Sequence, residues 1–314
     1  MLAVLAPGQG SQKPGFLAPW LDLPGAETRL RGWSALADVD LVHLGATADA
    51  DEIRDTAKTQ PLLVAAALLS GEQLDLSGVS VLAGHSVGEI GAAALAGVIS
   101  PEAAIGFAAV RGREMAAACA LEPTSMIALL GGDPAEVLAA IEAAGLYPAN
   151  RNGAGQIVVA GSTEALAAFT ANPPARTRLI PLKVAGAFHT PYMAPAEKAL
   201  AAVASDITPT NPSRIVLSNL DGSRVDDGAA MLARLVNQVT APVRWDLCMG
   251  TLADIGVTAV IELPPAGTLA GLVKRELKGI EIVAVNTPDD LAPARDLIAR
   301  HGPGHPHAPI GGQQ

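Results

Sequence analysis

The chain has 314 residues, of which 50% are hydrophobic and 17% charged, so we expect a sizeable core in one large domain or two modest ones. Aromatic residues make up only 3%, and Leu, Val, Ile and Ala must therefore build that core. The net charge of −10 argues against nucleic acids and anionic membranes as partners.

Three local features favour a cytoplasmic protein. The longest apolar run, residues 62–69, is far shorter than the ~20 residues that span a bilayer. Residues 1–8 lack a basic leader and a cleavage pattern, which favours a first buried strand over a signal peptide. The two cysteines, Cys119 and Cys248, lie in apolar helical contexts and make no disulfide scaffold. We expect a reducing, cytoplasmic setting and a monomer.

Short apolar segments alternate with helical patterns along most of the chain, which predicts a mostly parallel sheet covered by helices on both faces. In chain order, strands are predicted at 2–6, 79–83, 214–219, 257–263 and 281–286, and helices at 60–73, 101–120, 231–239, 246–255, 268–277 and 288–300.

Residues 123–187 break this rhythm with the order βαββαβ, which is the split ferredoxin-like pattern. We expect them to form a small subdomain inserted into a large domain made of residues 1–122 and 188–300. The predicted elements are strands at 125–130, 147–152, 156–161 and 178–184, and helices at 134–144, with Asp133 as N-cap, and 163–171.

The remaining residues, 301–314, are rich in Gly, Pro and His, and we predict a disordered tail rather than a metal site.

The sequence Gly-His-Ser-Val-Gly-Glu at 84–89 carries the strongest functional signal. The apolar run 79–83 precedes it and the helix-forming run 90–95 follows, which places Ser86 at the apex of a strand–turn–helix. The flanking glycines let strand and helix approach closely. The backbone N–H of Val87 begins the helix without an internal partner and can donate to a developing oxyanion. This pattern favours a nucleophilic serine over an ordinary glycine-rich turn.

A serine nucleophile needs a base, and outside the tail the histidines are His43, His85 and His189. His85 adjoins Ser86, so its side chain leaves the turn in another direction, and His43 lies in an unremarkable segment. His189 follows the point where the subdomain rejoins the large domain, and clefts form at such junctions. His189 is therefore the candidate base, with a turn-capping histidine as the alternative. Between Ser86 and His189 no acid stands on a loop after a sheet strand, so a backbone carbonyl can replace the triad acid as orienting group.

Two further segments can contact a ligand. Residues 8–12, Gly-Gln-Gly-Ser-Gln, do not fit a phosphate loop, because no Gly-Lys-Ser/Thr follows. They do not fit a dinucleotide fingerprint either, because Lys13 stands where the third glycine belongs. Their glycines suit close approach to a ligand, although a plain β–α turn explains them equally well. Arg111 lies on an apolar helix, where a planar guanidinium suits a carboxylate partner. The pattern does not separate it from Arg113, and a surface arginine is the alternative for each.

Together these motifs resemble the malonyl-CoA:acyl carrier protein transacylases of type II fatty acid and polyketide synthesis, over almost the whole chain short of the tail. The resemblance implies an α/β-hydrolase-like core, with Ser86 acylated and the backbone N–H groups of Val87 and Gln9 forming the oxyanion hole. It implies that His189 is the base. The backbone carbonyl of Gln238 would orient that base, and Arg111 would pair with the free malonyl carboxylate.

The resemblance also implies the surroundings of the site. Phe188 is the form associated with malonyl rather than methylmalonyl units, and Gln9, His85 and Asn152 are expected to line the substrate cleft. The family usually has Glu-x-Gly-Pro-Gly near its last strands. Here residues 262–266 read Glu-Leu-Pro-Pro-Ala, so we expect a loop of different shape.

The implied mechanism is ping-pong transfer of malonyl from malonyl-CoA to an acyl carrier protein, with no metal and no cofactor beyond the thioester substrate. The carrier is acidic in these pathways, and we expect it to dock at basic residues along the cleft edge, namely Lys183, Arg151, Lys274 and Arg275. A serine thioesterase or esterase and a non-catalytic scaffold are the alternatives. Fatty acid and polyketide synthesis are not distinguished.

Overall fold

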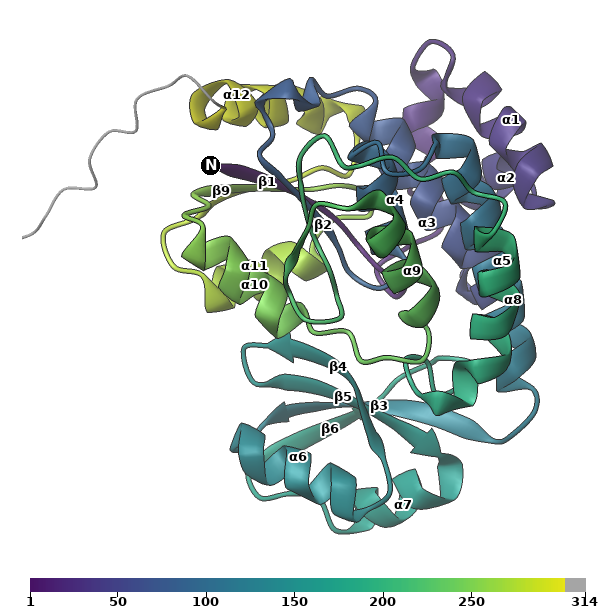
Figure 1. The fold of residues 1–314 in the computed structure, drawn as a ribbon, viewed down its shortest axis with the longest axis vertical. Coiled ribbons are helices and arrows are strands. Elements are labelled where there is room, and N and C mark those ends of the chain that lie inside the picture. The colour runs from purple at the N-terminus through teal and green to yellow at the C-terminus, as the bar shows by residue number, and fades with distance from the viewer. Residues whose placement is uncertain (303–314) are drawn as a thin grey trace, which may run out of the picture.

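The computed structural model describes residues 1–302, which form a large α/β domain and a smaller subdomain beneath it (Figure 1). No helix in this described span is long and apolar enough to cross a membrane. Residues 303–314 of the predicted tail lie outside it. His301 was wrongly placed in that tail: it closes helix α12 (Leu291–His301), and its Nδ1 lies 2.9 Å from Oγ1 of Thr258.

A six-stranded sheet in the order β10-β9-β1-β2-β7-β8 forms the centre of the large domain, and all neighbouring strands are parallel except β7 and β8. This confirms the predicted fold class. Only β8 was not predicted, because two residues are too few to show a pattern. The strands are β1 (Leu2–Ala6), β2 (Val81–Gly84), β7 (Ile215–Leu217), β8 (Arg224–Val225), β9 (Ala259–Glu262) and β10 (Glu281–Ala284).

Alternate residues of β1 face two separate cores. Leu2, Val4 and Ala6 pack into the larger core, whereas Ala3 and Leu5 pack against the helices that cover the opposite face. The opposite face carries α10 (Trp245–Asp254) and α11 (Thr268–Glu276). The larger core is covered by α12 and by α1 (Ala26–Ala37), α2 (Leu41–Ala46), α3 (Thr56–Gly71), α4 (Gly88–Leu95), α5 (Pro101–Cys119), α8 (Ala194–Ala204) and α9 (Gly228–Asn237).

Three of these helices, α1, α2 and α8, were not predicted from the sequence. In α1 the signal is present, because Leu30, Trp33 and Ala37 recur at helical spacing and are all buried. α2 has only six residues, and most of the residues of α8 are alanine, so their apolar periodicity is weak.

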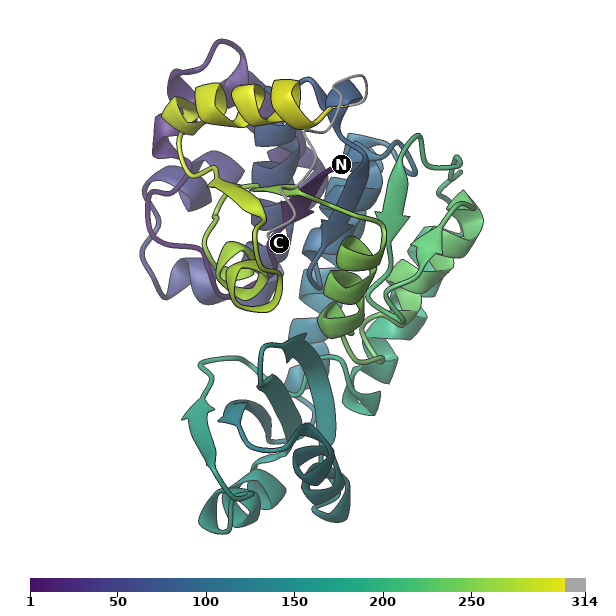
Figure 2. The same ribbon diagram turned by 90° about the vertical axis from the view of Figure 1, so that its left-hand side faces the viewer.

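The small subdomain is an antiparallel sheet in the order β4-β5-β3-β6 with two helices on its outer face (Figure 2). Its element order is the predicted βαββαβ. The predicted N-cap is also confirmed, because the Asp133 carboxylate accepts from the N–H groups of Ala135 and Glu136. The elements are β3 (Thr124–Gly131), α6 (Pro134–Ala143), β4 (Tyr147–Gly153), β5 (Gln156–Ser162), α7 (Thr163–Ala171) and β6 (Thr177–Pro181).

Backbone hydrogen bonds fix the subdomain to the large domain at β4. The N–H of Arg151 donates to the carbonyl of Val243 at 2.9 Å, and the N–H of Val243 donates to the carbonyl of Ala149 at 2.9 Å. The chain just before α10 therefore extends the edge of the small sheet. This pairing fixes the position of the small subdomain against the large domain.

The turn between β2 and α4 requires glycine at both ends. A Cβ on Gly84 would lie 2.1 Å from the carbonyl oxygen of Gly88, and one on Gly88 would lie 2.2 Å from the carbonyl oxygen of Ala6. At the apex Ser86 has a φ of +53°, in the left-handed region that a side chain disfavours. The predicted strained elbow is therefore present.

We predict that Gly84→Ala lowers the melting temperature sharply or prevents folding, because the added methyl overlaps rigid backbone rather than a movable side chain. Gly106→Ala, within α5, is the matched control, since its Cβ meets no other part of the fold within 4 Å. It should be neutral or stabilising by up to about 1 kcal/mol. Thermal unfolding followed by circular dichroism measures both, and equal melting temperatures would contradict the packing argument.

Candidate active site

A cavity of about 490 Å³ opens where the loops after β1 and β2 meet the small subdomain. Most of the predicted site residues line it: Gln9, His85, Ser86, Val87, Arg111, Asn152, Lys183, Phe188 and His189. Gln238 is buried beside the cavity, at the C-terminal end of α9, while Arg151, Lys274 and Arg275 do not line it.

Ser86 and His189, the predicted nucleophile and base, lie within hydrogen-bond distance of each other. Oγ of Ser86 lies 2.7 Å from Nε2 of His189, and Nδ1 of the same ring lies 2.8 Å from the backbone carbonyl oxygen of Gln238. Because a carbonyl only accepts, Nδ1 carries the proton and Nε2 presents its lone pair to the serine hydroxyl. This is the arrangement that the resemblance implies for Gln238.

The environment of His189 keeps its imidazole neutral. Burial lowers its pKa to about 3, and the positive charge of Arg111 acts in the same direction. Among residues 1–302 no carboxylate contacts either ring nitrogen, as the missing triad acid led us to expect. A neutral imidazole is the form that can remove a proton from Ser86.

The backbone at the elbow leaves donors free for an oxyanion. The N–H of Ser86 donates to Oδ1 of Asn219 at 2.7 Å, whereas the N–H groups of Val87 and Gln9 have no partner within the described chain. The side-chain amide of Gln9 donates to Oγ1 of Thr56 at 3.3 Å, and Gln9 and Val87 both line the cavity. These contacts support the predicted oxyanion hole.

Arg111 is buried on α5 and held by amides rather than by a carboxylate. Nη1 donates to Oε1 of Gln60 and Nη2 to Oε1 of Gln238, both at 2.7 Å, while Nη2 also lies 3.4 Å from Oγ of Ser86. Nε has no partner within the described residues. Burial lowers the pKa of Arg111 only to about 10, so the side chain remains charged. A buried cation with an unused donor beside the Ser86 hydroxyl has the chemistry to bind a carboxylate.

The structure separates the two arginines that the sequence pattern did not, because Arg113 on the same helix is exposed.

Three polar residues at the site were missed by sequence reasoning: Gln60, Glu89 and Asn219. Each is buried, and each contacts a residue of the predicted constellation. Gln60 and Glu89 stand beside runs of small or apolar residues, which is a usable signal for a buried polar group. Asn219 gives no such signal, because it follows the short strand β7.

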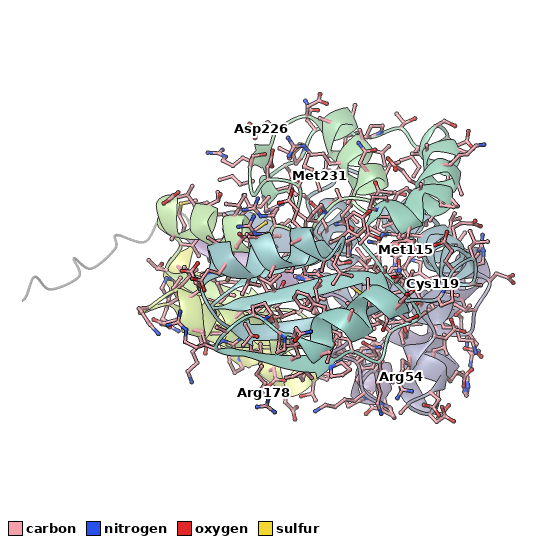
Figure 3. The ribbon with its side chains drawn as sticks, turned by 90° about the horizontal axis from the view of Figure 1, so that it is seen from below. Arg54, Met115, Cys119, Arg178, Asp226 and Met231 are labelled. Atoms are coloured by element: carbon pink, nitrogen blue, oxygen red, sulfur yellow. The ribbon has the colours of Figure 1, made fainter. Side chains whose placement is uncertain are left out.

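His85 and Asn152 connect the two domains at the cavity wall. Nε2 of His85 lies 2.9 Å from Oδ1 of Asn152, and the amide of Asn152 donates to Oε1 of Gln156 at 3.0 Å. The imidazole packs edge-on against Trp245. Seen from below, Met115 and Cys119 of α5 lie beside the small subdomain (Figure 3), and Met115 extends the cavity lining.

The basic residues predicted for docking differ in their surroundings. Lys183 is exposed and lines the cavity, and Lys274 and Arg275 are exposed at the end of α11. Arg151 instead lies with its Nε 3.4 Å from Oδ2 of Asp246, so part of its charge is already compensated.

The first residue of the altered loop at 262–266 stabilises the start of helix α11. The buried carboxylate of Glu262 accepts from the N–H groups of Gly267, Leu269 and Ala270 at 2.8–2.9 Å, and so caps the start of α11.

A serine at a strand–helix elbow, in contact with a buried histidine and a buried arginine, is an arrangement that can perform covalent acyl transfer. The acyl transferase domain family matches residues 5–294. The malonyl CoA-acyl carrier protein transacylase of Mycobacterium tuberculosis is 55% identical over 93% of this chain and 98% of its own length. That of Escherichia coli is 33% identical over 94% and 99%.

Solved structures agree. A crystal structure of the Mycobacterium tuberculosis enzyme superposes with a TM-score of 0.91 at 54% identity, covering 94% of this chain and 99% of that one. A type II polyketide synthase acyl-carrier protein in complex with its malonyl-transacylase matches with a TM-score of 0.87 at 32% identity, covering 94% and 99%. The chain belongs to the malonyl CoA-acyl carrier protein transacylases and is an acyltransferase.

We predict that Ser86→Ala abolishes the covalent acyl-enzyme while leaving the melting temperature within a few degrees of wild type, because only the hydroxyl is lost. Incubation with radiolabelled malonyl-CoA followed by a denaturing gel measures this. A label that survives on the alanine variant would move the nucleophile elsewhere.

For Arg111→Ala we predict a loss of malonyl transfer of roughly 30- to 5,000-fold, the ~2–5 kcal/mol that truncating one partner of a buried charge pair costs. Acetyl transfer should be spared or improved, because acetyl has no carboxylate to pair. Arg113→Ala is the matched control and should change neither rate. Parallel assays with malonyl-CoA and acetyl-CoA test this, and an equal loss for both acyl groups would indicate a structural role.

Proposed function

We propose that this transacylase moves a malonyl group from malonyl-CoA to the phosphopantetheine thiol of an acyl carrier protein through an ester on Ser86. The observation that carries the proposal is the charge of Arg111, held 3.4 Å from the Ser86 hydroxyl with no ion pair to a carboxylate among residues 1–302. An acyl group on Ser86 that ends in a carboxylate would supply that partner.

In the first half-reaction Oγ of Ser86 attacks the thioester carbonyl while Nε2 of His189 takes the hydroxyl proton. The oxyanion of the tetrahedral intermediate accepts from the backbone N–H groups of Val87 and Gln9. The intermediate then collapses, the carbon–sulfur bond breaks, and His189 returns its proton to the departing sulfur of coenzyme A. The malonyl group is left as an ester on Ser86.

The second half-reaction reverses these roles. The carrier thiol gives its proton to His189 as its sulfur attacks the ester carbonyl. The bond to Oγ of Ser86 then breaks, and His189 returns the proton to Oγ. No cofactor is required beyond the thioester substrate, because the serine, the imidazole and two backbone donors supply every step.

The same geometry explains selectivity. An acetyl group would displace water from the guanidinium of Arg111 without offering a negative oxygen in exchange. An unpaired buried donor costs more free energy than a missing methylene, so such a site can reject the smaller acyl group strongly.

Charge distribution supports docking at the small subdomain. Residues 123–187 balance four basic residues against four acidic ones, so the net charge of −10 resides in the rest of the chain. An acidic carrier is repelled least there, and Lys183 stands at the cavity edge with its ammonium exposed. We place the carrier against this edge, with Lys274 and Arg275 across the opening. The transacylase of the polyketide complex serves a polyketide carrier; for this chain we propose fatty acid synthesis.

A reducing, cytoplasmic location and a monomeric state complete the proposal. Both cysteines are free thiols, and burial raises the pKa of each, so neither is poised to form a disulfide.

We predict that Lys183→Glu raises the apparent KM for acyl carrier protein several-fold at low salt and leaves self-malonylation from malonyl-CoA unchanged. Rim charges act mainly on association rate, so the effect should shrink as salt rises. Arg224→Glu on the edge strand β8, outside the cavity, is the matched control. An unchanged KM at low salt would rule out this docking edge.

A further inference from the structure

A cluster of three buried polar residues lies directly beneath the nucleophile elbow. Oε1 of Glu89 accepts from the N–H of Asn219 at 2.7 Å, and Oε2 of Glu89 accepts from Nε2 of Gln238. Nε2 of Gln238 also lies 3.3 Å from Oδ1 of Asn219. All three residues are at most 4% exposed, and the acyl-transfer steps above use only the backbone carbonyl of one of them.

Ser86, His189 and Arg111 all contact this cluster. Asn219 accepts from the N–H of Ser86, and the amide of Gln238 donates to the carbonyl of Ser86 at 3.0 Å, so both backbone polar groups of the nucleophile are fixed. The backbone carbonyl of Gln238 orients His189, and its Oε1 accepts from Arg111. One residue, Gln238, therefore connects nucleophile, base and carboxylate-binding cation.

A primary amide can point either end toward a neighbour, so something must decide which way Gln238 faces. Arg111 only donates and requires Oε1, while a carboxylate only accepts and requires Nε2. Glu89 satisfies the second condition from the opposite side to Arg111. Its two oxygens accept from Asn219 and Gln238 at once, a set of contacts that a neutral amide of the same shape cannot reproduce.

We propose that Glu89 is a positioning residue for acyl transfer, whose ionised carboxylate holds the Gln238 amide with Oε1 on Arg111 and Nε2 under Ser86. The inference rests on the proposed function only because malonyl transfer is the activity that the test measures. Which groups donate and which accept within the cluster does not depend on the acyl group.

Acyl transfer should depend on pH through the ionisation of Glu89. Glu89 faces Arg111 of α5, Cys248 of α10, and the uncharged Ser218, Asn219 and Gln238. Burial raises the pKa of Glu89 to about 7, while the thiol pKa of Cys248 is raised and the pKa of Arg111 stays near 10. His189 titrates far lower, near 3. An acid limb near pH 7 in kcat/KM, which reports the free enzyme, would thus belong to Glu89 and not to the base.

The test compares wild type, Glu89→Gln and the exposed control Glu102→Gln in kcat/KM for malonyl-CoA and acetyl-CoA between pH 5.5 and 9. We expect Glu89→Gln to lose about 10- to 100-fold with malonyl-CoA at pH 8, by analogy with the loss when a residue that orients a metal ligand is removed. The loss with acetyl-CoA should be smaller, because only malonyl needs Arg111 held in place. Glu102→Gln should match wild type.

The pH dependence of kcat/KM can be compared even if Glu89→Gln folds poorly, because the wild type and the folded fraction of the variant are measured separately. Wild-type kcat/KM should fall as pH drops through about 7, because the carboxylate then takes up a proton and loses an acceptor. The folded fraction of Glu89→Gln should lack this limb. An unchanged limb in that variant, or activity within twofold of wild type at pH 8, would overturn the assignment. A wild-type enzyme that forms no malonyl-serine would instead contradict the proposed function. The role of Glu89 would then be tested by comparing kcat/KM for acetyl-CoA between wild type and Glu89→Gln.

Discussion

The site depends on keeping one positive charge, that of Arg111, buried without an ion pair to any carboxylate of residues 1–302. Desolvation makes an isolated charge costly, and a direct carboxylate partner would remove that cost but would also occupy the place of the substrate. The fold resolves this with the oxygens of two amides, Gln60 and Gln238, which stabilise the cation without neutralising it. The nearest buried carboxylate, Glu89, is kept one residue away behind Gln238. Selectivity for an acidic acyl group follows from this separation of charges.

The arrangement sacrifices stability for function. The pKa of Glu89 rises from its ordinary 4.5 to about 7, and a shift of that size corresponds to about 3 kcal/mol in favour of the protonated form. Since the folded state holds the proton more tightly, the free energy of unfolding falls by about this amount as pH rises from 4.5 through 7. An enzyme active at neutral pH carries that penalty together with the left-handed backbone of Ser86, and its large alanine- and leucine-rich cores compensate for both.

The sequence predicts the parts of this design that are local. Ser86 stands between an apolar strand and a helix-forming run, and periodicity separates the two sheets, so the elbow, the fold class and the inserted subdomain can be predicted. His189 is found by elimination, and the resemblance supplies Gln9 and Gln238. What the sequence does not contain is the meeting of distant residues in one buried cluster. Asn219 and Glu89 are 130 positions apart, and only the packing of the β7–β8 turn under α4 joins them. The same limit explains Arg151, whose ion pair with Asp246 depends on how the two bodies meet.

The most direct test of this account is a crystal structure of the malonyl-enzyme, trapped at low temperature before the carrier protein is added. The account predicts an ester on Oγ of Ser86, the distal carboxylate within hydrogen-bond distance of the Arg111 guanidinium, and Oε1 of Gln238 still accepting from that side chain. A carboxylate turned toward Lys183 or solvent, with Arg111 bound only by the two amides, would contradict it.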